Sequence, residues 1–229
     1  MFNKKKILGI LPARAGSKEI KNKNLKIVGG KPLVYWSAKA LANSKLVDYK
    51  LCTTDSKIIF KICKKIGLEV PWMRPKKLSG DLTDIRDVII HAVSKVKKKF
   101  NILVLVQATS PMVKSKDIDD AIKIFVKNKS NILISATKLD EVSPEIIFLK
   151  KNNNIEWLVN NKKNFARRQS FKNYFKRVGL IYIINIKKFI KTKSFFSKIT
   201  SVYEVSKKKS ITIDTYKDLE EARKIFRNL

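Results

Sequence analysis

The first apolar run of the chain ends in a loop whose residue types suit phosphate binding. The loop carries four cations together with two small residues and an amide, namely Arg14, Gly16, Ser17, Lys18, Lys21, Lys23 and Asn24. Gly16 and Ser17 permit a tight turn whose backbone N–H groups can donate hydrogen bonds to phosphate oxygens. The order and spacing are not those of a GxxxxGK[ST] P-loop. The residues alone therefore leave a phosphate-binding loop and a solvated lysine loop as open interpretations.

Two further polar groups follow apolar runs. Gln107 and Ser110 come directly after the unbroken apolar residues 102–106, where they can bind the edge of a base or a sugar, or only cap a turn before Pro111. Asp214 lies just before a helical pattern, where a carboxylate caps the helix or holds a divalent cation.

Other reactive side chains are few. The chain has one histidine, His91, and two cysteines, Cys52 and Cys63, which are not spaced as a CxxC pair. We expect His91 to be a surface or satisfied residue and the cysteines to lie in the core. This composition argues against a zinc site and favours a reducing, cytoplasmic setting.

The elements that must position these residues alternate along the chain. Short apolar runs predict strands, and apolar residues at helical spacing predict helices between them. The strands are expected at 6–13, 47–54, 69–72, 102–106, 131–137, 179–186 and 211–214, and the helices at 32–42, 56–66, 84–97, 118–126 and 217–226. This alternation indicates an open α/β sheet, in which ligands bind beyond the carboxyl ends of the strands.

The alternation is interrupted at residues 138–177, which are polar and basic-aromatic and contain no further βα unit. We therefore predict one α/β domain formed by residues 1–137 and 178–229, with an inserted arm at 138–177.

The net charge of +32 suggests a different function, the binding of nucleic acid. Residues 149–209 hold 17 basic and 2 acidic residues with aromatic residues among them, which is typical of nucleic-acid binding. However, only eight of the 51 basic residues are arginine, and abundant Lys, Asn and Ile also reflect A/T-rich codons. We therefore favour a compositional origin and keep an α/β protein that binds nucleic acid as the alternative. No apolar run is long enough for a membrane helix, so we expect no membrane partner.

Taken in order, several motifs resemble those of the acylneuraminate cytidylyltransferases, or CMP-sialic acid synthetases. They run through most of the chain: ILPARAGSK at 10–18, KNL at 23–25, GKPL at 30–33, TTD at 53–55, RP at 74–75, LVQATSP at 105–111, RQ at 168–169, GLIY at 179–182 and IDT at 213–215. The resemblance implies a Rossmann-like nucleotidyltransferase sheet with helices on both faces, and an inserted arm at 138–177 that forms a homodimer. It also implies a cytoplasmic enzyme of bacterial surface polysaccharide biosynthesis.

The implied reaction joins CTP to a sialic-type nonulosonic acid, namely N-acetylneuraminate or a legionaminate- or pseudaminate-like relative, and gives CMP-sugar and pyrophosphate with Mg²⁺. A CMP-Kdo synthetase has a similar phosphate loop and is the alternative, although the motifs at 168–169 and 179–182 favour the nine-carbon branch. By resemblance, the nucleotide is bound by Arg14, Ser17, Lys18, Lys23, Asn24 and Arg74, and the sugar acid by Gln107, Thr109, Ser110, Arg168, Gln169 and Lys176. Arg14, Lys23 and Asp214 are the implied catalytic residues, with Asp214 as the metal ligand.

Four positions depart from the family's pattern. Glu19 and Thr212 stand where the family usually has glycine and a first metal carboxylate, and Val113 and Val178 replace a frequent arginine and asparagine. These changes bear on the number of metal ions, the sugar and the activity level, and they do not affect the predicted fold.

Overall fold

The computed structural model describes residues 1–139, 144–159 and 173–228. Its body is built on a six-stranded sheet in the order β10-β6-β9-β5-β1-β4. The strands are β1 Ile7–Pro12, β4 Tyr49–Thr53, β5 Ile102–Val106, β6 Ile132–Lys138, β9 Phe175–Asn185 and β10 Thr200–Glu204. All neighbouring strands are parallel except where β9 pairs with β5 and β6. Every residue of β5 is buried, as expected for a central strand that is covered on both faces.

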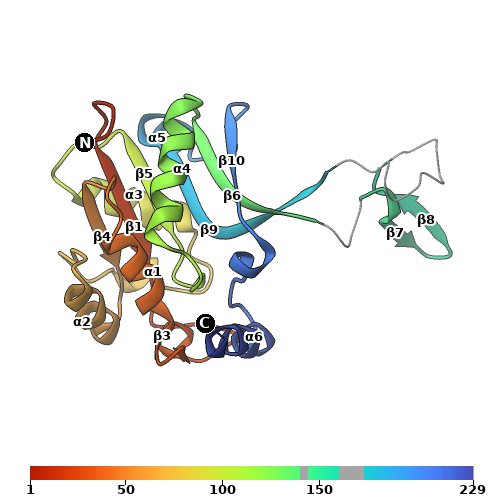
Figure 1. Ribbon diagram of the computed structural model, residues 1–229, viewed down its shortest axis with the longest axis horizontal. Coiled ribbons are helices and arrows are strands. Elements are labelled where there is room, and N and C mark those ends of the chain that lie inside the picture. Colours follow the sequence, from red (N-terminus) through yellow and green to blue (C-terminus); the bar gives the residue numbers. More distant parts are fainter. Residues whose placement is uncertain (140–143, 160–172, 229) are drawn as a thin grey trace.

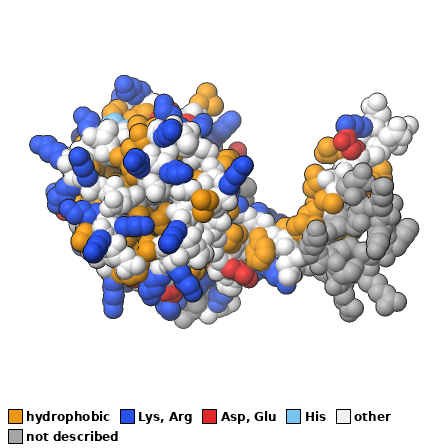
Figure 2. All heavy atoms as spheres, turned by 90° about the horizontal axis from the view of Figure 1, so that it is seen from above, with side chains coloured by type: hydrophobic (Ala, Val, Ile, Leu, Met, Phe, Trp, Pro, Cys, Tyr) orange, Lys and Arg blue, Asp and Glu red, His pale blue; other side chains and the backbone are white. Residues whose placement is uncertain are grey.

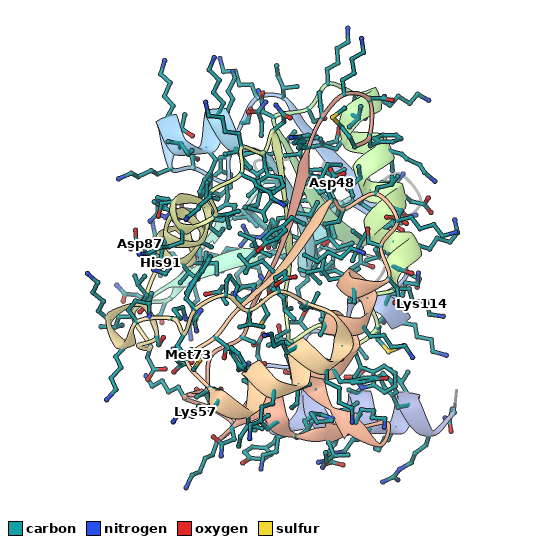
Figure 3. All side chains as sticks on the ribbon, turned by 90° about the vertical axis from the view of Figure 1, so that its left-hand side faces the viewer. Asp48, Lys57, Met73, Asp87, His91 and Lys114 are labelled. Atoms are coloured by element: carbon teal, nitrogen blue, oxygen red, sulfur yellow. The ribbon has the colours of Figure 1, made fainter. Side chains whose placement is uncertain are left out.

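Helices cover both faces of this sheet. They are α1 Leu33–Ala42, α2 Lys57–Ile66, α3 Ile85–Lys95, α4 Ser115–Lys127, α5 Ile186–Thr192 and α6 Tyr216–Arg227. Alternation along β1 separates two apolar clusters, since Ile7 packs with α1, α2 and α4 while Leu8 packs with α3 and α5. Figure 3 shows His91 of α3 and Lys114, just before α4, on opposite sides of the sheet. The predicted α/β architecture with helices on both faces is therefore confirmed.

A third, smaller apolar cluster joins the two ends of the chain. Ile20 from the first loop packs in it with Ile213 and with Leu219 of α6. The short strands β2 Ile27–Val28 and β3 Lys31–Pro32 form a hairpin beside α6 (Figure 1). Gly29 between them has φ +56°, and a Cβ there would lie 2.3 Å from the ring of Phe226. This packing brings the residues after β1 close to those before α6.

Some predicted elements differ from the structure. Residues 69–72 form only an isolated bridge between Leu51 and Glu69, and residues 211–214 form no strand. The strands of the two small hairpins, β2 with β3 and β7 (Phe148–Lys151) with β8 (Asn154–Trp157), had not been predicted, and neither had α5 and β10. Within the edge strand β10 only Ser201 is buried, so its sequence lacks the apolar signal of a central strand. The helix α5 has seven residues and buries only Ile186 and Phe189.

The predicted arm begins where two long strands leave the sheet. The pairing of β6 with β9 continues through Ala136–Arg177, Thr137–Lys176 and Lys138–Phe175. Beyond it, β7 Phe148–Lys151 and β8 Asn154–Trp157 form a hairpin that lies away from the body (Figure 1). The other short elements are the 3-10 turns Lys23–Leu25, Lys76–Leu78, Pro144–Ile146 and Lys207–Ser210. A dimerising role for residues 138–177 stays a prediction.

The surface charge is widely distributed. Figure 2 shows Lys and Arg side chains over the whole visible face of the body, with no single gathered patch. Within the described residues, the structure has no helix with the length and apolar character needed to cross a membrane.

Candidate functional site

The loops that follow β1 and β5, together with the segment 74–88 that leads into α3, line a cleft of about 340 Å³. Because β1 and β5 are neighbours and run parallel, their following loops meet at one edge of the sheet. The cleft is lined by Pro12, Arg14, Gly16, Ser17, Lys23, Asn24, Arg74, Leu78, Gly80, Asp81, Thr83, Ile85, Val88, Gln107, Ala108 and Thr109. Five of the six residues predicted to bind a nucleotide therefore lie together; the sixth, Lys18, is exposed and does not line the cleft.

Arg14 reaches from the first loop to the loop before α3. Its Nη1 donates to the carbonyl oxygen of Gly80 at 2.7 Å, and its Nη2 lies 2.7 Å from Asp81 Oδ1. Asp81 was not among the predicted site residues. Since both partners come from one loop, the guanidinium of Arg14 ties the 80–81 segment to the phosphate-loop candidate.

Arg74 is a buried cation at the base of the cleft, with 5% of its surface exposed. Its Nε donates to Ser79 Oγ at 3.1 Å, and its Nη2 lies 3.8 Å from Asp55 Oδ1. Burial lowers the pKa of Arg74, and the Asp55 carboxylate offsets part of that shift. Asp55 also accepts a hydrogen bond from the backbone N–H of Ala15 at 2.8 Å. The TTD motif at 53–55 was the sequence signal for this second unpredicted site residue.

Lys23 and Asn24 stand at the boundary between the first loop and Asp214. Lys23 Nζ lies 2.8 Å from Asp214 Oδ1 and only 13% of the lysine side chain is exposed. Asn24 Nδ2 donates to the carbonyl oxygen of Arg14 at 2.9 Å, while its buried Oδ1 has no hydrogen-bond partner among the described residues. The amide thus keeps an unused acceptor at the wall of the cleft.

A second hollow of about 500 Å³ adjoins the first and shares Gln107 with it. It is lined by Gln107, Thr137, Lys176, Arg177, Val178, Gly179, Tyr182, Ser210, Ile211, Thr212, Asp214, Asp218 and Glu221. Gly179 packs against the Gln107 side chain, because a Cβ at position 179 would lie 2.4 Å from Gln107 Oε1. Two cations of β9, Lys176 and Arg177, thus line the same hollow as three carboxylates from the segment around α6. These carboxylates are Asp214, Asp218 and Glu221.

The residues predicted to bind a sugar acid divide into three groups. Gln107, Thr109 and Lys176 line one or both hollows. Ser110 is fully buried, and its hydroxyl donates to the carbonyl oxygen of Gly179 at 2.9 Å, so it holds the turn against β9. Arg168 and Gln169 lie outside the described residues.

Asp218 lies beside Asp214, the carboxylate that is paired with Lys23. Asp218 accepts hydrogen bonds from the backbone N–H groups of Asp214 at 3.0 Å and Thr215 at 2.7 Å, which caps α6. Burial alone would raise the pKa of Asp218. These hydrogen bonds and the charge of Lys23 outweigh that effect, so the pKa is lowered overall and the carboxylate is held ionised. Asp218 is engaged as a cap, whereas the Asp214 side chain is 67% exposed.

The departures from the family pattern have distinct surroundings. Val113 and Val178 are buried and pack in the core with α1, α2 and α4, where an unpaired polar side chain would be costly. Glu19 is exposed, and Thr212 lines the second hollow. His91 lines neither hollow; its ring lies edge-on to Trp72, and its buried Nδ1 has no hydrogen-bond partner among the described residues. His91 is half-buried, so of the two predicted alternatives, a surface or a satisfied residue, the structure fits the surface one better.

Comparison with known proteins identifies the family of the chain. The cytidylyltransferase family model matches residues 8–228. The chain is 28% identical over 225 residues to a pseudaminic acid cytidylyltransferase of Campylobacter jejuni, with 97% of each chain covered. It is 31% identical over 215 residues to a CMP-N,N'-diacetyllegionaminic acid synthase of Legionella pneumophila, with 92% of this chain and 91% of that protein covered.

Solved structures share the fold. A CMP:2-keto-3-deoxy-manno-octonic acid synthetase complexed with CTP matches with a TM-score of 0.73 at 17% identity, covering 97% of this chain and 99% of the other. Because the family model spans nearly the whole chain and the strand-end cleft has its motif residues in place, this protein belongs to the cytidylyltransferase family and is a nucleotidyltransferase.

Proposed function

We propose that the protein joins CTP to a nonulosonic acid and releases CMP-sugar and pyrophosphate. The observation that carries this proposal is the pair of adjoining hollows, which share Gln107 and are linked by the ion pair between Lys23 and Asp214. Two substrates that react with each other need two such sites in contact. The relatives named for pseudaminic and diacetyllegionaminic acid support an acidic nine-carbon sugar as the acceptor.

The first hollow suits a nucleoside triphosphate. Arg14, Lys23 and Arg74 supply three cations to it, and Gly16 and Ser17 supply a backbone turn. Charge-assisted bonds from Arg and Lys are the strongest contacts that a protein side chain makes with phosphate. Asn24 Oδ1 is a free acceptor for a donor group of the base or ribose.

The second hollow suits a sugar with a carboxylate. Lys176 and Arg177 offer positive charge on one wall, and Gln107 and Thr212 offer hydrogen bonds. We assign the carboxylate of the sugar acid to the cations of β9, with its reactive hydroxyl toward Gln107 and the first hollow.

In the proposed reaction the anomeric hydroxyl oxygen attacks the α-phosphorus of CTP. An O–P bond forms, the bond between the α-phosphorus and the bridging oxygen breaks, pyrophosphate leaves, and the hydroxyl proton passes to solvent. Such a transfer depends on positioning and on neutralising the charge that develops on the phosphate oxygens. Arg14 and Lys23 would supply that neutralisation from the protein.

Magnesium is the proposed cofactor, and the residues present can hold it through a single carboxylate. Within the described residues no group of three His, Cys, Asp or Glu side chains is arranged to hold a metal. Mg²⁺ is commonly bound by one or two carboxylates together with substrate phosphates and water. The exposed carboxylate of Asp214 meets that requirement as the single protein ligand. A bound Mg²⁺ would neutralise phosphate charge and orient the leaving group.

We also propose a homodimer formed through the arm. Its described part exposes large apolar side chains that are unusual on a free surface, namely Ile146, Phe148, Leu149, Ile155, Trp157, Leu158 and Phe175. Light scattering of the purified protein tests this, and a monomer at micromolar concentration would contradict it. The free buried cysteines and the need for CTP fit a cytoplasmic enzyme.

An assay of pyrophosphate release decides the main proposal. The protein is incubated with Mg²⁺, with CTP or UTP, and with N-acetylneuraminate, a legionaminate, a pseudaminate or the eight-carbon Kdo. We expect release only with CTP and a nine-carbon acid, and its loss in Asp214→Asn but not in Glu220→Gln, a control on the exposed side of α6. Release with Kdo alone would select the CMP-Kdo alternative. Silence with every acid would reject the proposal.

The nucleic-acid alternative has its own test. It predicts tight binding of RNA or DNA with a steep loss of affinity as salt rises. Binding no tighter than micromolar at physiological salt would dismiss it.

A further inference from the structure

A buried carboxylate lies outside both hollows, at the start of α4. The side chain of Asp117 is 4% exposed, and three donors surround it. Its Oδ1 accepts from Lys209 Nζ at 2.5 Å and from the Tyr203 hydroxyl at 2.9 Å, and its Oδ2 accepts from the backbone N–H of Lys114 at 2.9 Å. Burial, together with the Asp117 carboxylate, raises the pKa of Tyr203, which keeps the phenol protonated as a donor.

Asp117 thereby joins two segments that border the substrate hollows. On one side, α4 follows the Gln107–Ser110 turn, and Asp117 caps that helix through Lys114. On the other side, Lys209 lies in the 3-10 turn Lys207–Ser210, directly before Ser210, Ile211 and Thr212 of the second hollow. The two segments meet again where the backbone N–H of Ile213 donates to the carbonyl oxygen of Thr109 at 2.9 Å.

The strength of this link follows from its burial. An ion pair in which one partner is almost fully buried is costly to break, because removing the cation leaves a charge without compensation. The partners are 92 positions apart in the chain, so the pair joins two segments that are distant in the sequence.

We propose that the Asp117–Lys209 ion pair is a positioning device that fixes the wall of the sugar-acid hollow formed by residues 210–214. This inference rests on the proposed function for the identity of the ligand, whereas the clamp itself is a property of the structure. Lys209 lines neither hollow. It acts by holding Thr212 and Asp214 at the distance from Gln107 that the sugar acid requires.

Two neighbouring lysines provide a matched test. Lys209→Met removes the cation that is paired with Asp117, while Lys208→Met removes an exposed cation from the same turn. We expect Lys209→Met to raise the KM for the sugar acid at least about tenfold with little change in the KM for CTP. Lys208→Met should change neither constant by more than about twofold. Tyr203→Phe is the second test, for use if Lys209→Met does not fold. It removes one donor to Asp117 and should raise the KM for the sugar acid by about three- to fivefold.

Hydrogen exchange separates the clamp from the proposed function. If the pair holds the wall, exchange of the Ile213 amide should speed up at least about tenfold in Lys209→Met, or about threefold in Tyr203→Phe, and stay at the wild-type rate in Lys208→Met. Unchanged exchange at Ile213 would overturn the clamp whether or not any sugar acid reacts. A general loss of stability with both KM values unchanged would show a merely structural pair and would also overturn it. Absence of pyrophosphate release in the wild type would reject the proposed function alone.

Discussion

Lys23 Nζ lies 2.8 Å from Asp214 Oδ1, although 191 positions separate the two residues in the chain. The contact joins the predicted phosphate cation to the predicted metal carboxylate before either meets a substrate. It is held by the small apolar cluster in which Ile20, three residues before Lys23, packs with Ile213. A triphosphate that enters the cleft must therefore compete with Asp214 for the ammonium group.

The first prediction concerns Lys23. Lys23→Ala should lower kcat/KM by more than about 100-fold, which corresponds to about 2.7 kcal/mol of lost transition-state stabilisation. Lys21→Ala is the matched control, because Lys21 is exposed on the same loop and does not line the cleft. Steady-state kinetics of pyrophosphate release measure both. A loss below about threefold in Lys23→Ala would remove Lys23 from the reaction.

The second prediction concerns the pairing of Arg14 with Asp81. Asp81 competes with phosphate for the Arg14 guanidinium, and the pair is partly exposed, so its contribution is at most about 1 kcal/mol. Asp81→Asn should therefore lower the KM for CTP by up to about fivefold. Asp87→Asn makes the same change of charge on the exposed side of α3 and should leave the KM almost unchanged. Equal effects of the two variants would indicate a general charge effect instead.

The third prediction concerns the contact between Gly179 and Gln107. A Cβ at position 179 would lie 2.4 Å from Oε1 and 3.0 Å from Cδ of Gln107, so Gly179→Ala must displace that side chain from both hollows. We expect a loss of at least about tenfold in kcat/KM, since a shift of about 1 Å at a positioning residue is enough to cost this much.

A double-mutant cycle isolates this contact. In the Gln107→Ala background the obstructing amide is absent, so adding Gly179→Ala should cost less than about twofold. Equal losses in both backgrounds would mean that the alanine acts on β9 itself and not through Gln107.

Much of the sheet was predictable because its central strands are buried on both faces. The apolar run at 102–106 is β5, and Gln107 and Thr109 after it line the cleft. By contrast, the edge strand β10 and the short helix α5 bury too few side chains to leave a pattern. The strand predicted at 211–214 is an extended segment, because its backbone bonds go to Thr109 and to the Asp218 cap instead of to a neighbouring strand.

The site shows the same division. Arg14 and Lys23 were predicted because their loop follows a buried strand and because its motif resembles that of the family. Asp55 and Asp81 were not, because their roles depend on contacts with residues 40 and 67 positions away. The sequence identified the cations of the cleft more readily than the carboxylates that hold those cations in place.

The fourth prediction concerns stability and pH. Burial lowers the pKa of His91, and the charges of Lys95, Lys77 and Arg74 lower it further. In the unfolded chain the imidazole takes up a proton near pH 6.5, whereas in the folded protein it does so only at lower pH. Below about pH 6.5 the unfolded state therefore binds more protons, and the free energy of unfolding decreases as pH falls through the folded pKa. His91→Gln, which cannot titrate, should lose less stability than the wild type between pH 7.5 and pH 5.5.

Urea unfolding at pH 7.5, 6.5 and 5.5 measures this difference. His91 is the only histidine of the chain, so the variant removes all imidazole titration, and the window stays above the range in which ordinary carboxylates titrate. The neutral ring lies edge-on to Trp72, and its buried Nδ1 has no hydrogen-bond partner in the part of the chain that the structure describes. If His91→Gln kept the full pH dependence of the wild type, the imidazole would not be its source, and the protonation difference between the folded and unfolded states would have to lie in other groups.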